Sequence, residues 1–217
     1  MAAIRCSQLG MKTALIEKYP TLGGTCLNVG CIPSKALLDS SHHYHDAVAH
    51  FEAHGIEIPG EIRVNLKKMI ERKQGVVDQT TKGIEFLMDK NNIDVYHGLG
   101  SFKDPTHIKI EGEEPIEIEA AKSIIATGSK PASLPFIKID KERVITSTEA
   151  LSLKEIPGHM VIIGGGVIGL ELGQVYRRLG AEVSVVEFMD RIIPGMDAGL
   201  SKELTKVFKK QGMKFYL

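Results

Sequence analysis

Apolar residues recur along this chain with two different spacings, which predict alternating helices and strands. Residues 2–9 have helical spacing, and Gly10 closes that helix. Residues 13–16 then form an apolar strand that ends at Glu17. Much later, strand 161–163, a helix and another apolar strand follow in the same order. Strands that alternate with helices in this way predict an α/β fold with parallel strands.

The two copies of this pattern are related by one constant offset. Gly10 and Glu17 recur as Gly180 and Glu187, an offset of 170 residues in both cases (180 − 10 and 187 − 17). The later copy also has a strand and a glycine-rich loop ahead of its helix, and the offset places their counterparts upstream of Met1. We therefore expect the chain to begin inside its first βαβ unit, without the first strand and glycine loop. The alternative is that the repeat is accidental and that Met1 is a true start.

The remaining segments are assigned by the same two spacings. We expect helices at residues 31–51, 65–90 and 198–211, and strands at 93–96, 107–111, 116–119, 122–125 and 213–217. The first three of these strands alternate polar and apolar residues, as half-exposed antiparallel strands do. A proline-containing connection over residues 131–157 suits a domain boundary. We predict one domain over residues 1–150 and the first part of a second over residues 151–217.

Composition narrows the possible partners and the compartment. The 217 residues are 43% hydrophobic and 25% charged with zero net charge, so nothing indicates binding to nucleic acid or to an anionic membrane. No apolar run reaches the roughly 18 residues that a membrane span needs. Only three cysteines fit a reducing compartment, and we expect a cytoplasmic location, or the mitochondrial matrix in a eukaryote. The histidines between residues 42 and 54 lack accompanying carboxylates or cysteines in register, so we expect no metal site.

Two of the cysteines, Cys26 and Cys31, are separated by four residues. On a regular helix they would be about 7.5 Å apart along the axis, whereas the Cα atoms of a disulfide lie roughly 4.4–6.8 Å apart. A bridge therefore needs an irregular backbone, which Gly30 permits, and Pro33 then suits the first turn of a helix. The start of that helix would stabilise a thiolate, so the pair is a candidate redox centre. The alternatives are two ordinary buried thiols or half of a zinc site.

The glycine-rich loop after strand 161–163 predicts a dinucleotide site. Gly164 allows the tight turn, Gly166 lets a pyrophosphate approach the backbone, and Gly169 lets the helix pack on the strand. Glu187 follows at the end of the next strand, where a carboxylate binds the 2′-OH of NAD and repels the 2′-phosphate of NADP. NAD is therefore favoured. The predicted NAD-binding residues are Gly164, Gly165, Gly166, Val167, Ile168, Gly169 and Glu187.

Residues 23–35, Gly-Gly-Thr-Cys-Leu-Asn-Val-Gly-Cys-Ile-Pro-Ser-Lys, resemble the redox-active disulfide motif of the flavin-dependent pyridine nucleotide-disulfide oxidoreductases. Their sequence is most similar to that of the dihydrolipoamide dehydrogenases of that family, and the resemblance extends over essentially the whole chain. It implies two nucleotide-binding, Rossmann-like three-layer domains, both incomplete. The first, residues 1–150, would bind FAD and lacks its first strand and glycine loop. The second, residues 151–217, would be the N-terminal part of an NAD-binding domain.

The resemblance also implies roles for individual residues. Cys26 would exchange with the lipoyl sulfur, Cys31 would face the flavin, and Lys35 would pair with Glu171 near the flavin and nicotinamide. Glu17 would bind the ribose of FAD, as an acidic residue at the end of such a strand can. For Glu171, Lys35 and Glu17 the alternative is a solvated surface side chain. The implied FAD-binding residues are Glu17, Gly24, Thr25, Cys26, Lys35, Gly100, Thr127, Gly128 and Ser129.

The activity implied is oxidation of dihydrolipoamide through the disulfide and FAD, with NAD as acceptor. The implied partners are the lipoyl domain of a 2-oxo acid dehydrogenase or glycine-cleavage complex and, at full length, a second copy of the chain. One alternative is a mercuric or glutathione reductase-like enzyme that uses NADPH, against which Glu187 argues. Another is an inert nucleotide-binding fragment, since an acid–base pair and further domains expected of the family are outside this chain.

Overall fold

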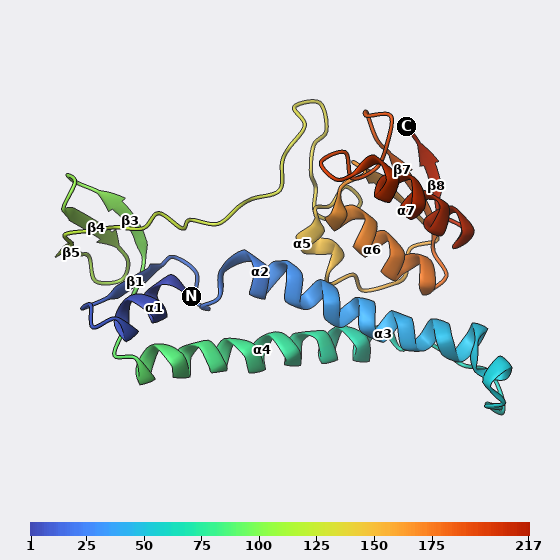
Figure 1. Cartoon of the computed structure of the whole chain (residues 1–217), viewed down its shortest axis with the longest axis horizontal. Coiled ribbons are helices and arrows are strands. Elements are labelled where there is room, and N and C mark those ends of the chain that lie inside the picture. The colour runs from blue at the N-terminus through green and yellow to red at the C-terminus, as the bar shows by residue number, and fades with distance from the viewer. The chain divides into compact units, whose positions relative to one another are not determined.

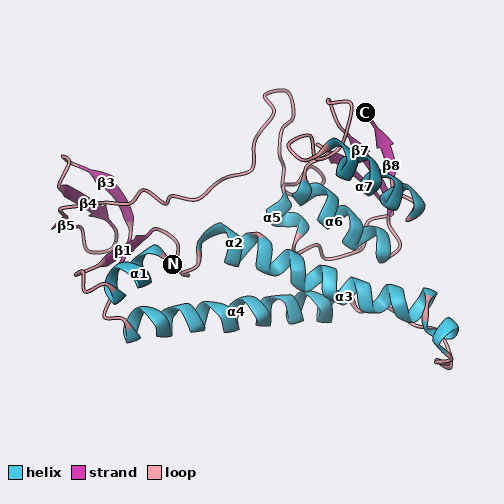
Figure 2. Cartoon of the chain, in the orientation of Figure 1, coloured by secondary structure: helices cyan, strands magenta, loops and turns pink.

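The computed structural model describes residues 1–217, which form two compact units. The first comprises residues 1–28 and 77–130, and the second comprises residues 29–76 and 131–217. The chain crosses between the units inside α2 (Gly24–Val29), inside α4 (Leu66–Lys90) and after residue 130. Figures 1 and 2 show the helices and strands of each unit.

The first unit contains a parallel strand pair and an antiparallel sheet. α1 (Ala2–Gln8) leads into β1 (Ala14–Glu17), and β1 pairs in parallel with β2 (Asp94–His97). The antiparallel sheet has the order β3-β4-β5, with bounds Leu99–Phe102, His107–Glu111 and Ile116–Glu119. Leu22, Met88 and Ile93 form the buried centre of this unit. These apolar contacts hold α4 and the parallel pair together.

Two of the strand predictions for this unit are wrong. Strand 93–96 was expected to be antiparallel, but β2 is parallel to β1, because the α4 crossover returns the chain to the same end of the sheet. Residues 122–125 form no strand, and the side chains of Ile124 and Ile125 expose 69% and 73% of their surface. None of β1–β5 pairs with this segment. An apolar run without a neighbouring strand has no partner for its backbone hydrogen bonds.

The helix that begins at the second motif cysteine belongs wholly to the second unit. α3 (Cys31–Ala49) is followed by a single 3₁₀ turn, η1 (Phe51–His54).

α4 passes through Gly75 and Gly83 without a break, although both interrupt the apolar pattern. Each glycine costs a helix interior about 1 kcal/mol, which the buried apolar residues along 25 residues of helix offset.

The second unit is built on a three-stranded parallel sheet. Its order is β6-β7-β8, with bounds His159–Ile163, Glu182–Val186 and Lys214–Tyr216. α6 (Val167–Arg178) and α7 (Ala198–Lys210) connect consecutive strands, and right-handed crossovers place both helices on one face. On that face Val183 and Val185 are fully buried. Expected helices and strands in this unit are confirmed.

The core of the second unit joins α3 to the nucleotide-type helix α6. Leu37 of α3 and Leu170 and Val175 of α6 belong to one buried cluster. Tyr176, also fully buried, donates a hydrogen bond of 2.5 Å to the carbonyl of Ala150 in the short helix α5 (Ser147–Ala150). This packing sets α3 and α6 side by side, as Figure 1 shows. The α/β class is confirmed, and the domain boundary at residue 150 stays a prediction.

The internal repeat is preserved in backbone hydrogen bonds. Gly10 donates to the carbonyl of Ser7, and Gly180 donates to that of Arg177. The next residue in each copy donates five residues back, as 11 to 6 and 181 to 176. Gly10 and Gly180 both have left-handed φ angles, +82° and +107°, which favour glycine at a helix C-terminus. Gly212 ends α7 with the same two hydrogen bonds and a φ of +86°, so this helix ending is a common one that agrees with the repeat without establishing it.

Candidate functional site

The loop over residues 164–169 has the geometry of a dinucleotide-binding turn. Gly164 follows β6 with φ +103°, and Gly166 is the N-cap of α6. A Cβ placed on Gly166 would meet no atom within 4 Å, so the space in front of the helix is open. A Cβ on Gly169 would lie 2.7 Å from Cγ2 of Ile162, which is too close for any side chain. The glycines at these positions therefore fit a pyrophosphate at the start of α6.

Glu187 lies beside this loop and is held by the backbone. Its carboxylate accepts hydrogen bonds from the N–H of Gly165 at 2.6 Å and from the N–H of Met189 at 2.8 Å. The hydrogen bond from Met189 and then that from Gly165 lower the pKa of Glu187 below its usual value. The carboxylate is therefore ionised and oriented at the carboxyl end of the sheet, where a ribose hydroxyl could donate to it.

Glu17 repeats part of this arrangement in the first unit. Its Oε1 accepts a hydrogen bond of 3.0 Å from the N–H of Tyr19, as Oε1 of Glu187 does from Met189. The offset between both pairs is again 170 residues (187 − 17 and 189 − 19). Two carboxylates with the same local turn therefore end equivalent strands, which supports the expectation that each meets a nucleotide.

Other predicted FAD residues of the first unit also lie together. Oγ1 of Thr25 is 3.5 Å from the carbonyl oxygen of Ser129, and a Cβ on Gly128 would lie 3.0 Å from the same Oγ1. Gly128 has φ +76°, so the turn after Thr127 favours glycine. The start of α2 and residues 127–129 thus approach each other closely. Gly24 is the first residue of α2, and its φ is +65°.

Gly100 occupies a second close approach in the same unit. It lies in β3, and a Cβ there would be 3.3 Å from Cγ2 of Ile16 in β1. Gly100 and Glu17 are therefore near neighbours. This arrangement fits the expectation that an adenosine group approaches the backbone here, although the glycine is also explained by packing against Ile16.

The two motif cysteines flank a break in the helical backbone. Cys26 lies in α2 and Cys31 begins α3, and both are exposed. Gly30 between the two helices has φ −138° and ψ −116°, which belongs to neither helix nor strand. The expected irregular backbone and the expected helix start at Cys31 are thereby confirmed. The pairing of the two sulfurs, which belong to different units, stays a prediction.

Lys35 and Glu171 form the expected ion pair inside the second unit. The ammonium of Lys35 lies 2.7 Å and 2.8 Å from the two carboxylate oxygens of Glu171. Lys35 is in the second turn of α3 and Glu171 is in the second turn of α6. The side chains are 57% and 26% exposed, so the pair lies at the surface and the alternative of solvated surface side chains stays open. The pair joins the helix of Cys31 to the helix of the glycine loop.

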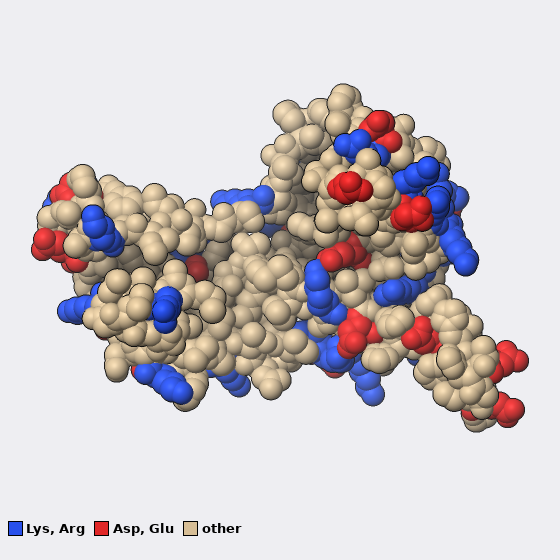
Figure 3. Space-filling model, in the orientation of Figure 1, with Lys and Arg blue, Asp and Glu red and all other residues tan.

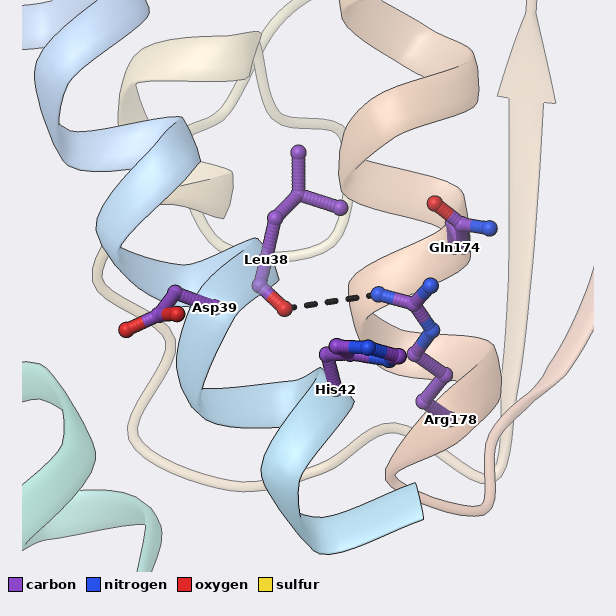
Figure 4. Close-up of a pocket in the computed structure, with 5 residues that line it drawn as sticks. All are labelled: Leu38, Asp39, His42, Gln174 and Arg178. Atoms are coloured by element: carbon purple, nitrogen blue, oxygen red, sulfur yellow. Dashed lines mark hydrogen bonds between the residues drawn. The ribbon is translucent and has the colours of Figure 1, made fainter. Parts of the chain in front are cut away.

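A shallow pocket of about 300 Å³ lies one turn further along the same two helices. Leu38, Asp39 and His42 of α3 line it together with Gln174 and Arg178 of α6 (Figure 4). The guanidinium of Arg178 donates to the carbonyl of Leu38 at 3.3 Å, and burial lowers the pKa of this arginine. None of the predicted site residues lines the pocket. It is a hollow in the contact between two helices.

Sequence reasoning missed two features of the site. Ile193 has a left-handed φ of +42°, unusual for a β-branched residue, and its N–H donates to the carbonyl of Gly165 at 2.8 Å. Ser34 is buried, and its hydroxyl lies close to Glu171. The sequence carries no pattern for the first feature. The position of Ser34 next to Lys35 was a usable indication of the second.

Surface charge and helix length add two findings. On the face seen in Figure 3, acidic and basic side chains are interspersed. None of the helices combines the length and apolar character that a membrane crossing requires.

Comparison with known proteins identifies the family. The pyridine nucleotide-disulphide oxidoreductase family matches residues 1–217. The mitochondrial dihydrolipoyl dehydrogenase of Schizosaccharomyces pombe is 49% identical over 218 residues, which cover 99% of this chain and 42% of that protein. Leghemoglobin reductase of Vigna unguiculata is 50% identical over 220 residues, which cover 100% of this chain and 42% of that protein.

A solved structure gives the same answer for the fold. The HOCl-induced flavoprotein disulfide reductase RclA from Escherichia coli matches with a TM-score of 0.81 at 28% identity, over 99% of this chain and 45% of that one. The chain thus spans less than half the length of the relatives it matches. With the family match over every residue and the glycine loop, carboxylates and cysteine motif in place, the chain belongs to the pyridine nucleotide-disulphide oxidoreductase family.

Proposed function

We propose that this chain is part of an NAD-linked, FAD-containing dihydrolipoamide dehydrogenase. The observation that carries the proposal is the cysteine motif itself: two exposed cysteines, Cys26 and Cys31, on either side of the backbone break at Gly30, with Cys31 at the start of a 19-residue helix. A helix start stabilises a thiolate. The relatives named dihydrolipoyl dehydrogenase support the choice of substrate.

The chemistry of the cysteine pair follows from thiol–disulfide exchange. One thiolate of dihydrolipoamide attacks the sulfur of Cys26, the Cys26–Cys31 bond breaks, and Cys31 leaves as a thiolate. The second thiol of the substrate, once deprotonated, attacks the sulfur now bonded to Cys26. This step releases Cys26 as a thiolate, which takes up the proton that the second substrate thiol lost, and forms the cyclic disulfide of lipoamide. Two electrons have then passed from the substrate to the cysteine pair.

Residues of both units would hold the cofactors. In the first unit Glu17, Gly24, Thr25, Cys26, Gly100 and residues 127–129 would bind FAD, and Lys35 of the second unit is also expected to bind it. In the second unit residues 164–169 would bind the pyrophosphate of NAD, and Glu187 would bind its adenosine ribose. When bound, FAD would accept the electron pair and NAD would remove it as a hydride.

The ionised Glu187 supports NAD over NADP. Its carboxylate is fixed by two backbone N–H groups, so it cannot swing away from a 2′-phosphate without losing both hydrogen bonds. Phe188 and Met189, the next two residues, offer no positive charge. This argues against a reductase that depends on NADPH.

The proposed partners are a lipoyl domain of a 2-oxo acid dehydrogenase or glycine-cleavage complex and a second copy of the complete chain. The mitochondrial relatives support a location in the mitochondrial matrix if the source is a eukaryote.

A steady-state assay of the complete protein that carries this chain tests the proposal. We expect oxidation of dihydrolipoamide with NAD and little with NADP, and we expect Cys26→Ser and Cys31→Ser each to reduce turnover to background. Reduction of glutathione disulfide or Hg(II) with NADPH, in the absence of dihydrolipoamide turnover, would overturn the proposal.

For the isolated 217-residue chain we expect no turnover of dihydrolipoamide. Stoichiometric FAD bound to it after gel filtration would contradict the view that this piece alone is inert.

A further inference from the structure

A buried serine touches the carboxylate of the Lys35–Glu171 pair. Ser34 precedes Lys35 in α3 and exposes only 7% of its surface. Its hydroxyl oxygen lies 3.1 Å from the carbonyl oxygen of Cys31 and 3.5 Å from Oε2 of Glu171. The carboxylate of Glu171 is therefore approached by the ammonium of Lys35, whose side chain is 57% exposed, and by the hydroxyl of the buried Ser34.

The hydroxyl has one hydrogen and two possible acceptors. It donates either to the carbonyl of Cys31 or to the carboxylate of Glu171, and a rotation about the C–O bond exchanges the two states. Hydrogen bonds to an ionised acceptor are roughly twice as strong as those between neutral groups. The carbonyl of Cys31 can meanwhile accept from the helix backbone, and Oε2 of Glu171, which accepts from the Lys35 ammonium at 2.8 Å, has a further lone pair for the hydroxyl. The state that donates to Glu171 is therefore accessible without moving any heavy atom.

A second serine on the same helix shows what the contact adds. Ser41 is fully buried, lies two turns after Ser34, and donates to the carbonyl three residues back, Leu38, at 2.9 Å. Ser34 makes the equivalent bond to Cys31. The two serines thus share burial, helix and local hydrogen bond, but the structure gives a carboxylate contact to Ser34 alone.

We propose that Ser34 is a positioning residue that holds the carboxylate of Glu171 in place for Lys35. It thereby fixes the first turns of the cysteine helix α3 against the nucleotide helix α6. The roles of α3 as the cysteine helix and α6 as the nucleotide helix rest on the proposed function, but the contact itself does not.

The reactivity of the Lys35 amine tests the contact directly. Reductive methylation of the folded protein, read out peptide by peptide with mass spectrometry, gives the rate at Lys35 relative to Lys202 on α7. Loss of an ion pair of this exposure should change the relative methylation rate at Lys35 by about twofold to fivefold. We expect Glu171→Gln to raise the relative rate at Lys35 by this factor. We expect Ser34→Ala to produce most of the same increase. The double variant should react no faster than Glu171→Gln alone.

Ser41→Ala is the matched control, because it removes the same kind of buried hydroxyl from the same helix. We expect it to leave the relative rate at Lys35 unchanged. A general loosening of the fold would raise the rates at Lys35 and Lys202 together. The proposal is overturned if Ser34→Ala leaves the relative rate unchanged, or if Ser41→Ala raises it equally. Failure of dihydrolipoamide turnover would overturn the proposed function and leave this result intact.

Discussion

At the scale of single residues, the site depends on carboxylates and glycines whose positions are fixed by backbone contacts. The sequence alone identified Glu17 and Glu187 as strand-end acids because they recur at one offset. It could not show that Glu187 accepts two backbone hydrogen bonds, since one of the donors, Gly165, lies 22 residues earlier. That contact exists only once β6 and β7 are paired.

Replacement of Glu187 by Gln tests this contact through pH. The folded-state pKa of Glu187 is lowered by the N–H groups of Met189 and Gly165, so the stabilisation is present above the usual pKa near 4.5 and is lost as pH falls through the folded value. We expect Glu187→Gln to lower the free energy of unfolding by about 1 kcal/mol at pH 7. Urea melts should show the difference between variant and native protein shrinking below pH 4.5. A difference that is independent of pH would contradict this origin.

The replacement of Gly169 by Ala tests the packing of α6 on its strand. The added Cβ would lie 2.7 Å from Cγ2 of Ile162, and overpacking of this kind costs about 1–3 kcal/mol. Thermal melts should show this loss, and a second change, Ile162→Leu, should recover part of it because leucine has no Cγ2. Gly158→Ala is the control, since a Cβ there meets nothing within 4 Å. Equal losses at both glycines would rule out the proposed clash.

At the scale of elements, the local sequence pattern predicted well which segments are helices and strands, and predicted poorly which strands pair with each other. Helices over residues 198–210 and 31–49 and the three strands of the second unit follow from apolar spacing and lie close to where it placed them. The segment with Ile124 and Ile125 is equally apolar, yet it forms no strand, because a strand depends on a neighbour that local spacing does not report. For the same reason the parallel direction of β2 was missed.

The contact between α5 and α6 offers a prediction at this scale. Tyr176 is fully buried, and burial raises its pKa to about 12. Its neutral form is therefore favoured in the folded state, so stability should fall as pH rises from 10 to about 12. Tyr176→Phe leaves the buried carbonyl of Ala150 without this donor and should cost about 1–3 kcal/mol at neutral pH. It should also abolish the tyrosine transition near pH 12 in an absorbance titration. Because the chain has five tyrosines, the relevant transition is the one that Tyr176→Phe removes, and its removal near pH 10 instead of pH 12 would show that the hydroxyl is not buried.

At the scale of the whole molecule, the sequence predicted the family and the class of fold but not the compact units. The chain passes between units within α2 and within α4, and a helix pattern continues through such a crossing without any mark in composition. The cysteine motif lies across the first crossing, with Cys26 before it and Cys31 after it. The redox hypothesis thus joins residues that local packing assigns to different units.

The central claim is that Cys26 and Cys31 cycle between a disulfide and two thiols in exchange with NADH. Peptide mapping by mass spectrometry tests it, with the complete FAD-loaded protein alkylated before and after anaerobic addition of NADH. We expect one peptide pair linked through Cys26 and Cys31 before addition, and both cysteines alkylated afterwards. Cysteines that are already alkylated in the oxidised protein, or a linked pair that NADH leaves unchanged, would contradict the account.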